Sequence, residues 1–404
     1  MKMADTSGNV SMDLYQQYGV TRAINARGYS TKLGGCRLPA PVLDAMRSAA
    51  ESCVRMEDLQ EAASGVIAEV TGAEAGIITS GASAALTLAA AACLTGLDIT
   101  KMNHLPDTTD MPNEIVVQKA HRNDYDHALR LAGARLVEAG FSYYTFAYDV
   151  ESLITSRTVA LFYLAGAGAT TLPLNEFVNV AHKHGLPVIV DAAAALPPAE
   201  NLRAIIATGA DLVAFSGGKH IQGPQASGIL CGRKDLILAA TLQHQDMDVF
   251  PENWPRRKLI HDGVIPSPPH HGIGRGFKVG KEEIAGLLAA LKLYQERDFA
   301  AELARWTKDV ELIQAAVSCI RGVTVHVVFP DTDGRPVPSA RVSLDLPAFT
   351  ANELINELQE GQPRIGVYET LASDGTVVIY PEALQEGQAH LVGERLREIL
   401  THAS

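Results

Sequence analysis

An aspartate and a lysine each follow an apolar run in the middle of the chain. Residues 188–190 (Val-Ile-Val) precede Asp191, and residues 212–215 (Leu-Val-Ala-Phe) precede Ser216-Gly217-Gly218-Lys219. Short apolar runs that end at a polar or small residue are typical of buried strands in a parallel sheet. Lys219 follows Asp191 by 28 residues, about the length of one strand–helix–strand unit. The spacing therefore predicts a carboxylate and an amine at the same edge of one sheet.

This pair of groups suits pyridoxal 5'-phosphate (PLP). A lysine binds the cofactor as a Schiff base, and an aspartate keeps the pyridine nitrogen protonated so that the ring withdraws electrons. Ala193 is small enough to lie against one ring face, and His121 follows a run expected to be a strand, 114–118, where its ring is placed to stack over the cofactor. The sequence predicts PLP as the cofactor, with Lys219, Asp191 and His121 as catalytic residues.

Residues 79–85 (Thr-Ser-Gly-Ala-Ser-Ala-Ala) supply a place for the phosphate. They lie between an expected strand and an alanine-rich helix, so backbone N–H groups can reach an anion at the positive end of the helix. Ser216, three residues before Lys219, adds a hydroxyl. We expect the following residues to bind the cofactor: Ser80, Gly81, Ala82, Ser83, His121, Asp191, Ala193, Ser216, Gly218, Lys219 and Gly223.

Each of these features also has an ordinary structural interpretation. A strand-terminal aspartate is commonly a helix cap or turn residue, Gly-Ala-Ser before a helix is commonly a tight turn, and a single histidine is commonly a hydrogen-bonded loop residue. Their order on successive strand ends favours the cofactor site. The signatures GxGxxG after a strand, GxxxxGK[ST], GxSxG and HExxH are absent, and we expect no metal site.

The amino-acid composition and net charge exclude some classes of protein and of binding partner. The 404 residues are 47% hydrophobic, which excludes a disordered chain, and the net charge of −12 argues against nucleic acid as a partner. The five cysteines form no CxxC pair and indicate reduced thiols. Because the N-terminus lacks a secretory signal and the most apolar stretch, 81–97, is too short to span a bilayer, we expect a cytoplasmic protein without membrane contact.

Strand-like runs alternate with amphipathic stretches, a pattern that predicts an α/β fold with a mostly parallel sheet between helices. After residue 280 a helical pattern continues to 319, with a break near Arg297. Two strand pairs are expected next, 323–329 with 340–346 and 365–369 with 376–380. A last helix is expected over 384–400. We expect loop 330–336 to be exposed and the proline-rich segment 251–269 to be a functional loop. The strands of the large sheet are expected at 76–79, 114–118, 135–138, 159–164, 187–190, 212–215 and 228–231.

Several motifs between residues 15 and 291 occur together. Besides the aspartate and lysine motifs, they are Gly223-Pro224-Gln225-Ala226-Ser227-Gly228, Gly274-Arg275-Gly276-Phe277-Lys278-Val279-Gly280-Lys281-Glu282-Glu283 and the segments 20–28, 71–74 and 79–85. With these motifs the sequence resembles the fold-type I PLP enzymes. Within them it is similar to the branch that contains bacterial selenocysteine synthase (L-seryl-tRNA(Sec) selenium transferase) and D-glucosaminate-6-phosphate ammonia-lyase.

The resemblance implies a seven-stranded, mostly parallel sheet in the large domain, a smaller C-terminal α+β domain, and a homodimer or higher homo-oligomer with active sites at the subunit interface. It also implies the Schiff base on Lys219 and a carboxylate-binding role for Arg364. Selenocysteine synthase carries an extra N-terminal tRNA-binding domain, whereas this acidic chain begins close to Asn25, so we expect no tRNA substrate. The expected divisions are an N-terminal segment (1–30), a large PLP-binding domain (31–280) and a small domain (281–404).

Basic residues near the sheet edge are the candidates for substrate recognition. Arg275 lies in a glycine-rich loop and can clamp a carboxylate or phosphate through two hydrogen bonds. Arg27 is a second candidate, and His271, with His270, is a candidate polar contact or proton relay. The alternative for Arg275 is a structural salt bridge.

The cofactor motifs leave the reaction open. Lys219, once released from the cofactor, is the natural base for the Cα proton of an amino acid. A leaving group at Cβ then gives elimination of water and ammonia, whereas reprotonation gives racemisation or transamination. The resemblance favours elimination from a hydroxylated amino acid or amino sugar acid, with a racemase, an aminotransferase or a selenium or sulfur transferase as alternatives. A regulatory protein without catalysis would be expected to lack Lys219 or Asp191, and both are present.

Overall fold

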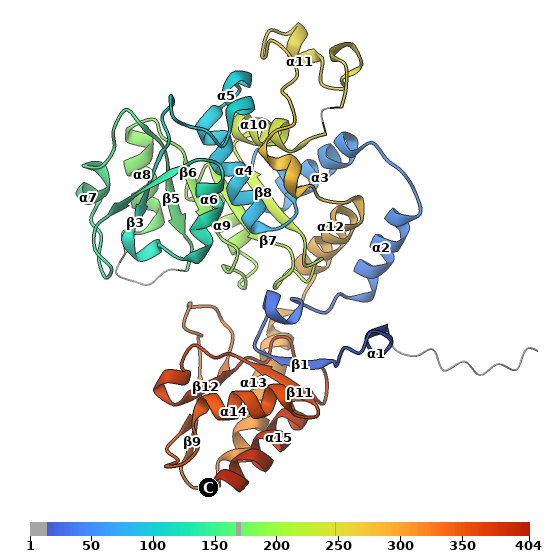
Figure 1. The fold of residues 1–404 in the computed structure, drawn as a ribbon, viewed down its shortest axis with the longest axis vertical. Coiled ribbons are helices and arrows are strands. Elements are labelled where there is room, and N and C mark those ends of the chain that lie inside the picture. Colours follow the sequence, from blue (N-terminus) through green and yellow to red (C-terminus); the bar gives the residue numbers. More distant parts are fainter. Residues whose placement is uncertain (1–13, 167–170, 247) are drawn as a thin grey trace, which may run out of the picture. The chain divides into compact units, whose positions relative to one another are not determined.

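The computed structural model describes residues 14–166, 171–246 and 248–404. Its contacts divide the chain into two units (Figure 1). Of the described residues, the larger unit comprises those in Gly34–Asp298 and Pro330–Pro336, and the smaller unit comprises Leu14–Leu33, Phe299–Phe329 and Val337–Ser404. Among the residues described, no helix is long and apolar enough to cross a bilayer.

The larger unit is built on a seven-stranded sheet. Six strands run parallel and β8 runs antiparallel to its neighbours β2 and β7. The strands occur in the spatial order β2-β8-β7-β6-β5-β3-β4. Their bounds are β2 Ala75–Thr79, β3 Glu114–Gln118, β4 Arg135–Ala139, β5 Thr158–Leu164, β6 Val188–Asp191, β7 Leu212–Ser216 and β8 Gly228–Gly232. Central strands are buried along their whole length, as a sheet covered on both faces requires.

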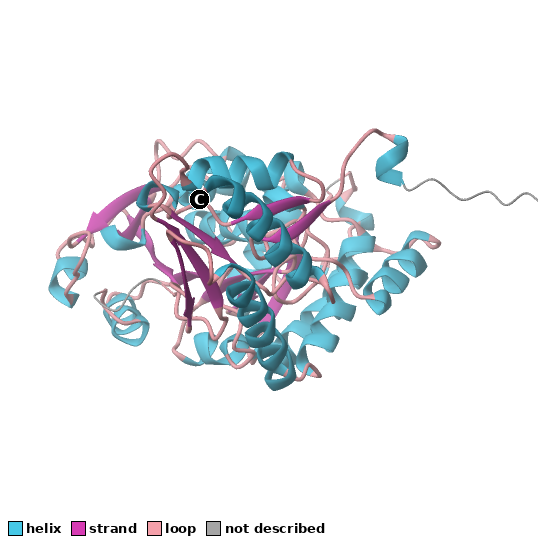
Figure 2. Ribbon diagram, turned by 90° about the horizontal axis from the view of Figure 1, so that it is seen from below, coloured by secondary structure: helices cyan, strands magenta, loops and turns pink. Residues whose placement is uncertain are grey.

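Two groups of helices pack on this sheet. Helices are cyan and strands magenta in Figure 2. Helix α4 contacts four of the central strands and also α5, α6 and α10. It is rich in alanine and leucine and buried around nearly its whole circumference, which explains why its sequence shows no polar face. The second group packs through α3, α8 and α9. The helices of this unit are α2 Ala40–Ala50, α3 Met56–Thr71, α4 Ala82–Thr95, α5 Ile99–His104, α6 His127–Leu131, α7 Ala147–Glu151, α8 Leu174–Lys183, α9 Asn201–Ala207, α10 Lys234–His244, α11 Lys258–His261 and α12 Lys281–Gln295.

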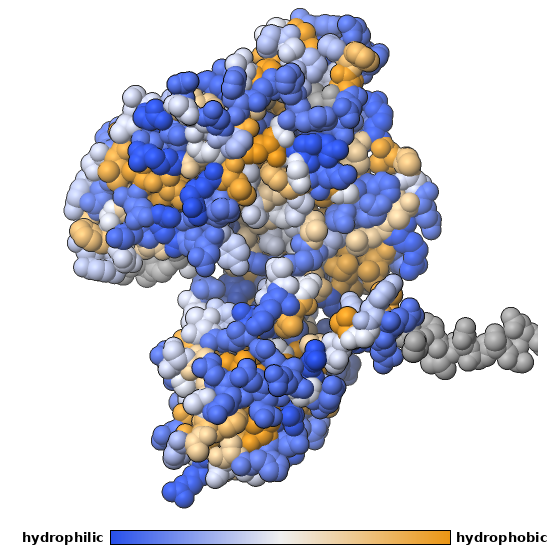
Figure 3. All heavy atoms as spheres, in the orientation of Figure 1, coloured by the Kyte–Doolittle hydropathy of each residue, from blue (hydrophilic) through white to orange (hydrophobic). Residues whose placement is uncertain are grey.

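The smaller unit has its own core. Strands β9 (Val323–Val328), β10 (Ser339–Leu344) and β12 (Thr376–Ile379) form an antiparallel sheet with β10 in the centre. Strand β1 (Ala23–Ala26) pairs in parallel with β11 (Arg364–Val367). The short helix α1 (Leu14–Gln17) buries no residue, whereas the helices that carry the core are α13 Phe299–Val317, α14 Ala351–Glu360 and α15 Gln388–Ala403. On the face shown in Figure 3, hydrophilic side chains predominate in both units, because most apolar residues lie in the cores.

The sequence predicted all seven strands of the large sheet, and the expected break near Arg297 separates α12 from α13. The predicted pairing of 365–369 with 376–380 is confirmed at one position only. β11 pairs with β1 and β12 pairs with β10, so that a single bridge, Tyr368 with Val378, joins the two segments. The reason is that the N-terminal strand supplies a partner that is distant in sequence.

Loop 330–336 is exposed at residues 332–334, as expected, whereas Asp331 is 5% exposed and Arg335 is half-buried. The loop's contacts group it with the larger unit. The proline-rich segment contains a 3-10 turn, Pro251–Asn253, and the one-turn helix α11. Helix α12 packs on α2 and α3, so the boundary between units lies after Asp298, whereas the sequence places it at residue 280.

Candidate functional site

The strand register brings the predicted chemical groups to one edge of the sheet. Asp191, the last residue of β6, lies between Leu164 of β5 and Ala214 of β7. At the other side of β7, Ser216 is opposite Gly228, which is in turn opposite Thr79 at the end of β2. The segments that follow β2, β5, β6 and β7 therefore emerge together, as the carboxyl ends of parallel strands do in open α/β sheets.

Asp191 is a buried carboxylate close to Lys219. Its side chain is 5% exposed, and Oδ1 accepts a hydrogen bond of 2.9 Å from the backbone N–H of Ala193. Burial raises the pKa of Asp191, while the Ala193 N–H and the charge of Lys219 act in the opposite direction. The predicted carboxylate and amine thus lie close enough for the charge of Lys219 to act on Asp191, across one strand–helix–strand unit.

His121 is fully buried just after β3. Its Nδ1 accepts a hydrogen bond of 3.2 Å from the backbone N–H of Leu164, and its ring meets Tyr163 edge-on, with centroids 4.4 Å apart. Burial lowers the pKa of His121 to about 4, so the imidazole is neutral at pH 7. Among the described residues Nε2 has no hydrogen-bond partner. The histidine therefore presents an N–H donor rather than a positive charge.

The turn before α4 has the form expected of an anion-binding turn. Gly81 has φ of +134°, and nothing lies within 4 Å of the position that a Cβ would take. The Ser80 hydroxyl donates to the carbonyl of Phe277, 2.8 Å away, so its proton is already used. Ser83 is exposed in the first turn of α4, and Ser216 is half-buried at the end of β7. The candidate donors to an anion are therefore the backbone N–H groups of this turn and the hydroxyls of Ser83 and Ser216.

A tight turn holds Lys219. The N–H of Gly223 donates to the carbonyl of Gly217 at 2.8 Å, and the N–H of Gln222 donates to the carbonyl of Lys219 at 2.9 Å. A Cβ on Gly218 would lie 2.7 Å from Cα of Gln225, closer than packed atoms approach, so a side chain is excluded there. The glycines next to Lys219 are required by this close packing.

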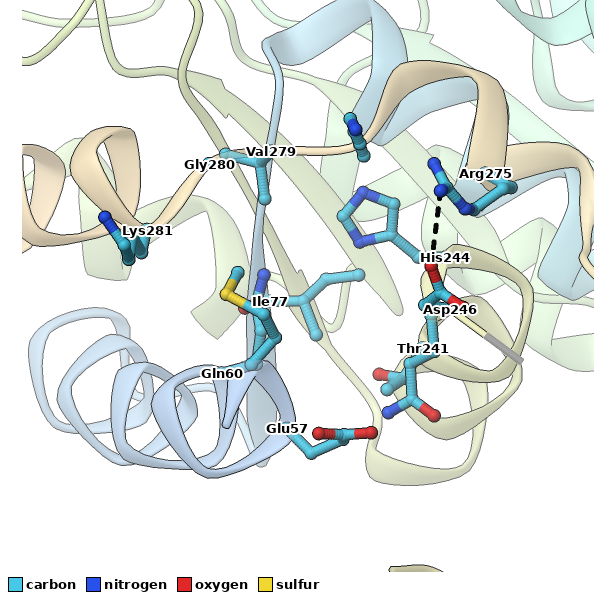
Figure 4. Close-up of a pocket in the computed structure, with 13 residues that line it drawn as sticks. Glu57, Gln60, Ile77, Thr241, His244, Asp246, Arg275, Val279, Gly280 and Lys281 are labelled. Atoms are coloured by element: carbon cyan, nitrogen blue, oxygen red, sulfur yellow. Dashed lines mark ion pairs between the residues drawn. The ribbon is translucent and has the colours of Figure 1, made fainter. Parts of the chain in front are cut away.

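Arg275 and His271 each lie next to an aspartate of the larger unit. Arg275 forms an ion pair of 3.2 Å with Asp246, and His271 lies 3.2 Å from Asp248. Arg275 lines a cavity of about 480 Å³ next to strand β2 (Figure 4). The cavity is also lined by His244, whose pKa is lowered by burial despite an opposing backbone hydrogen bond at Phe277, and by Lys278 and Lys281.

Arg27 and Arg364 lie in the smaller unit and line one cavity of about 250 Å³. Arg27 donates to the carbonyl of Val367 at 3.0 Å and pairs with Glu369 at 3.3 Å, whereas Arg364 is exposed at the start of β11. In the parallel pairing of β1 with β11, Arg364 lies opposite Ala23 at one end and Arg27 follows the other end, so the cavity that both arginines line extends along this strand pair.

Sequence reasoning missed three contributors to the site. Tyr163 and the backbone of Leu164 contact His121 from β5, and no local motif marks them. Gly228 faces the turn before α4, where a Cβ would lie 2.5 Å from the carbonyl carbon of Gly81. A glycine inside an apolar strand is a signal for such a close backbone approach.

The fold is that of the fold-type I PLP enzymes. Among solved structures, a cysteine desulfurase from Escherichia coli matches with a TM-score of 0.56 at 16% identity over 95% of this chain and 94% of the other. An alanine–glyoxylate aminotransferase from Nostoc sp. also has a TM-score of 0.56 at 16% identity, over 100% and 97% of the two chains. At these identities the similarity shows the fold.

The chain belongs to the SelA family: the model for L-seryl-tRNA selenium transferase matches residues 24–248. It is 35% identical to a 5'-C-glycyluridine monooxygenase-decarboxylase from Streptomyces sp., over 98% of this chain and 93% of the relative. It is 33% identical to a D-glucosaminate-6-phosphate ammonia lyase from Salmonella typhimurium, over 97% and 99% of the two chains. A solved D-glucosaminate-6-phosphate ammonia-lyase matches with a TM-score of 0.80 at 32% identity, covering 97% of this chain and 99% of the other.

Proposed function

We propose that the chain is a PLP-dependent carbon–nitrogen lyase that eliminates water and then ammonia from a hydroxylated amino acid or an amino sugar acid. The observation that carries the proposal is the placement of the buried Asp191 at the end of β6 and of Lys219 just after the neighbouring strand β7, where the charge of Lys219 acts on Asp191. The ammonia lyase that matches over nearly the whole of both chains supports the choice of elimination.

The residues at the sheet edge fit PLP. Nε2 of His121 is a buried donor without a partner among the described residues, and the position above Gly81 is open to an anion. Lys219 would hold the cofactor covalently, Asp191 would hold its pyridine nitrogen, and the turn 80–83 with Ser216 would hold its phosphate. Ala193, with its N–H fixed on Asp191, would lie against one ring face, and the glycines Gly218 and Gly223 would keep Lys219 in place.

PLP, when bound, supplies a sink for the electrons left at Cα of an amino acid. Asp191 contributes a negative charge in a buried position, where charges interact strongly. The Lys219 amine takes the proton from Cα and then gives a proton to the departing hydroxyl. His121, neutral and held by Leu164, contributes an N–H donor and a flat surface without competing for protons.

The proposed reaction balances in water. The hydroxyl group leaves Cβ as one water molecule, and one water molecule later hydrolyses the C–N bond. The net products are therefore one ammonia and one 2-keto acid for each substrate molecule.

Substrate recognition is proposed to use the basic residues. Arg275 lies in the larger unit with Lys278 at a cavity large enough for a phosphorylated sugar acid, and its guanidinium suits a phosphate or carboxylate. Arg27 and Arg364 are the carboxylate-binding candidates of the smaller unit, where they line one cavity. His271 is proposed as a polar contact.

We further propose a homodimer or higher oligomer in the cytoplasm that acts on a small molecule and does not bind nucleic acid. The exposed apolar residues around α1, Leu14, Tyr15, Tyr18 and Val20, support a contact with a second copy. The five free cysteines support a reducing compartment. Light scattering at several concentrations would test the oligomer, and a monomer at micromolar concentration would contradict it.

The PLP-loaded protein should release ammonia and a 2-keto acid in equal amounts without a keto-acid acceptor. The panel should contain hydroxylated amino acids and amino sugar acids, each with and without a phosphate. Equal release would establish the lyase and its substrate class. A cofactor spectrum that changes with substrate, without release of either product, would refute elimination.

A second candidate is favoured by the 35% identity to the monooxygenase-decarboxylase. On this alternative the substrate is an amino acid attached to a nucleoside, and the reaction consumes oxygen and releases CO₂. An oxygen electrode and a CO₂ assay on the same panel, extended to glycyl nucleosides, separate the two candidates. Oxygen uptake that depends on substrate would favour the second.

A further inference from the structure

Loop 330–336 connects two strands of the smaller unit but packs on the larger one. Its contacts assign it to the larger unit, and a Cβ on Gly166, just after β5, would lie 3.6 Å from the carbonyl oxygen of Asp333. Residues 333–335 also line a cavity of about 420 Å³ with Tyr163 and Leu164. The loop therefore reaches the edge of the sheet where the predicted catalytic groups gather.

A buried ion pair fixes the shape of this loop. Oδ1 of Asp331 accepts from the backbone N–H groups of Asp333 at 3.0 Å and Arg335 at 2.8 Å. Oδ2 accepts from the Arg335 side chain through Nε at 2.8 Å and Nη2 at 2.6 Å. The side chains of Asp331 and Arg335 are 0% and 15% exposed. This two-point pairing leaves the guanidinium little freedom to turn.

The remaining end of Arg335 contacts the residue after Lys219. Nη1 of Arg335 lies 3.4 Å from Nε2 of His220, a side chain that is 2% exposed. The His220 carbonyl accepts a second hydrogen bond, of 2.6 Å, from Nη1 of Arg297. Two guanidinium groups thus hold His220, one through its ring and one through its backbone.

We propose that Arg335 is a positioning residue that holds the turn carrying Lys219 in place through the ring of His220. Asp331 orients the guanidinium of Arg335, Arg335 donates a hydrogen bond to the ring of His220, and His220 is the next residue after Lys219 in the chain. A lysine that forms a covalent bond must lie close to the atom it attacks, so freedom in this turn slows the reaction. The inference rests on the proposed function for the role of Lys219, but the contact itself is tested without cofactor.

The first experiment measures amide hydrogen exchange over residues 217–223 in the cofactor-free protein. In Arg335→Ala this segment should exchange about tenfold faster, as expected when one hydrogen bond to a charged group is lost. Arg305→Ala is the matched control, because Arg305 also pairs with an aspartate four residues away but lies in α13. Unchanged exchange in Arg335→Ala would overturn the proposal.

The second experiment measures how fast the visible Lys219–PLP absorption band appears after PLP is added to cofactor-free protein. Arg335→Ala should slow the band about tenfold, and Arg335→Lys should restore part of the rate. The effects of Arg335→Ala and His220→Ala should be far from additive in the double variant; additive effects would refute transmission through His220. If Arg335→Ala does not fold, Arg335→Gln, which keeps a donor on an uncharged chain, replaces it and should slow the band less than tenfold.

The band of the wild-type chain distinguishes a failure of the proposed function from a failure of the role proposed for Arg335. A wild-type chain that gives no band contradicts the proposed function, whereas a normal wild-type band and an Arg335→Ala band at the same rate contradict only the role of Arg335.

Discussion

The backbone N–H of Leu164 donates a hydrogen bond of 3.2 Å to Nδ1 of His121. Because Nδ1 accepts this bond, the proton of the neutral ring is assigned to Nε2. The bond joins two neighbouring strand ends, since His121 follows β3 and Leu164 ends β5. The donor atom of His121 is thus fixed by the backbone of another strand.

His121 should not titrate near neutral pH. Burial lowers its pKa to about 4, so its ring signals in a proton NMR titration should stay constant from about pH 5.5 to 8, unlike those of an exposed histidine, whose pKa is about 6.5. His121→Phe identifies the signals by their disappearance. A midpoint near 6.5 for those signals would contradict the buried, neutral histidine.

Asp191→Asn should raise the stability of the cofactor-free protein but lower the activity of the PLP-loaded protein. Burial raises the pKa of this carboxyl in the folded chain. The folded state is therefore more stable at low pH, where the carboxyl is uncharged, and this stability is lost as pH rises through the raised pKa and the buried group becomes charged. The amide of Asp191→Asn stays uncharged at every pH, so the cofactor-free variant does not lose this stability. Its thermal midpoint at pH 8 should exceed that of the cofactor-free wild type. Calorimetry at pH 5 and pH 8 measures the difference, which should grow with pH.

The same substitution should lower turnover of the PLP-loaded protein by on the order of a hundredfold, as expected when one electrostatic contact is removed from a reacting centre. Asp191→Glu, which keeps the charge, is the control. Wild-type turnover in Asp191→Asn would show that the carboxylate has no part in the reaction.

Lys219→Ala should abolish the covalent link to the cofactor. The visible absorption band should be absent, and treatment with borohydride should leave no PLP attached to the protein, as mass spectrometry of the peptide around residue 219 would show. Lys278→Ala, at the cavity near Arg275, should keep the band. A band retained by Lys219→Ala would refute the assignment of this lysine.

Much of the site was predictable because its residues stand in local patterns. Asp191 and Lys219 each follow a short apolar run, and in a parallel sheet such runs end at one edge. Small residues in the sequence also predicted the turn before α4. The residues that contact His121 were not predictable, because Tyr163 and the Leu164 backbone carry no motif and reach His121 only through the order of strands in the sheet.

Long-range pairing explains what the sequence did not show in the smaller unit. A run such as 365–369 predicts a strand, but nothing in it specifies a partner at residues 23–26 rather than the nearer 376–380. Asp331 and Arg335 likewise read as an ordinary polar turn, because charge and turn residues are typical of exposed loops. Their burial depends on the fit of the pair to each other and to His220.

Gly228→Ala should weaken cofactor binding. A Cβ at this position would lie 2.5 Å from the carbonyl carbon of Gly81 and 2.7 Å from the backbone nitrogen of Ala82, and backbone atoms cannot move aside as a flexible side chain does. The turn before α4 must shift, at a cost of about 1–3 kcal/mol, so the Kd for PLP, measured by fluorescence titration, should rise by tenfold or more. Gly65→Ala in α3, where the added Cβ meets no atom within 4 Å, should leave the Kd unchanged, and an equal Kd in both variants would argue against an anion site at Gly81.

Glu114→Gln should lower stability at neutral pH and reduce the sensitivity of the fold to acid. The buried Glu114 at the start of β3 pairs with Arg135 and accepts from the Thr155 hydroxyl at 2.8 Å, and the bond from Arg135 lowers its pKa despite the opposing effect of burial. A lowered pKa in the folded state gives stability above the unfolded pKa of about 4.3, which is lost as pH falls through the folded value.

At pH 7 the loss of this charged pair should cost about 1–3 kcal/mol, seen as a fall of several degrees in the thermal midpoint, and the difference from the wild type should shrink between about pH 5 and pH 3. The exposed Glu394→Gln, which loses a contact with His390 in α15, should shift the midpoint by less than a degree or so, as isolated surface pairs contribute about 0–1 kcal/mol. A Glu114→Gln midpoint that falls by the same amount at pH 3 and pH 7 would show that the glutamate acts through packing rather than through its charge.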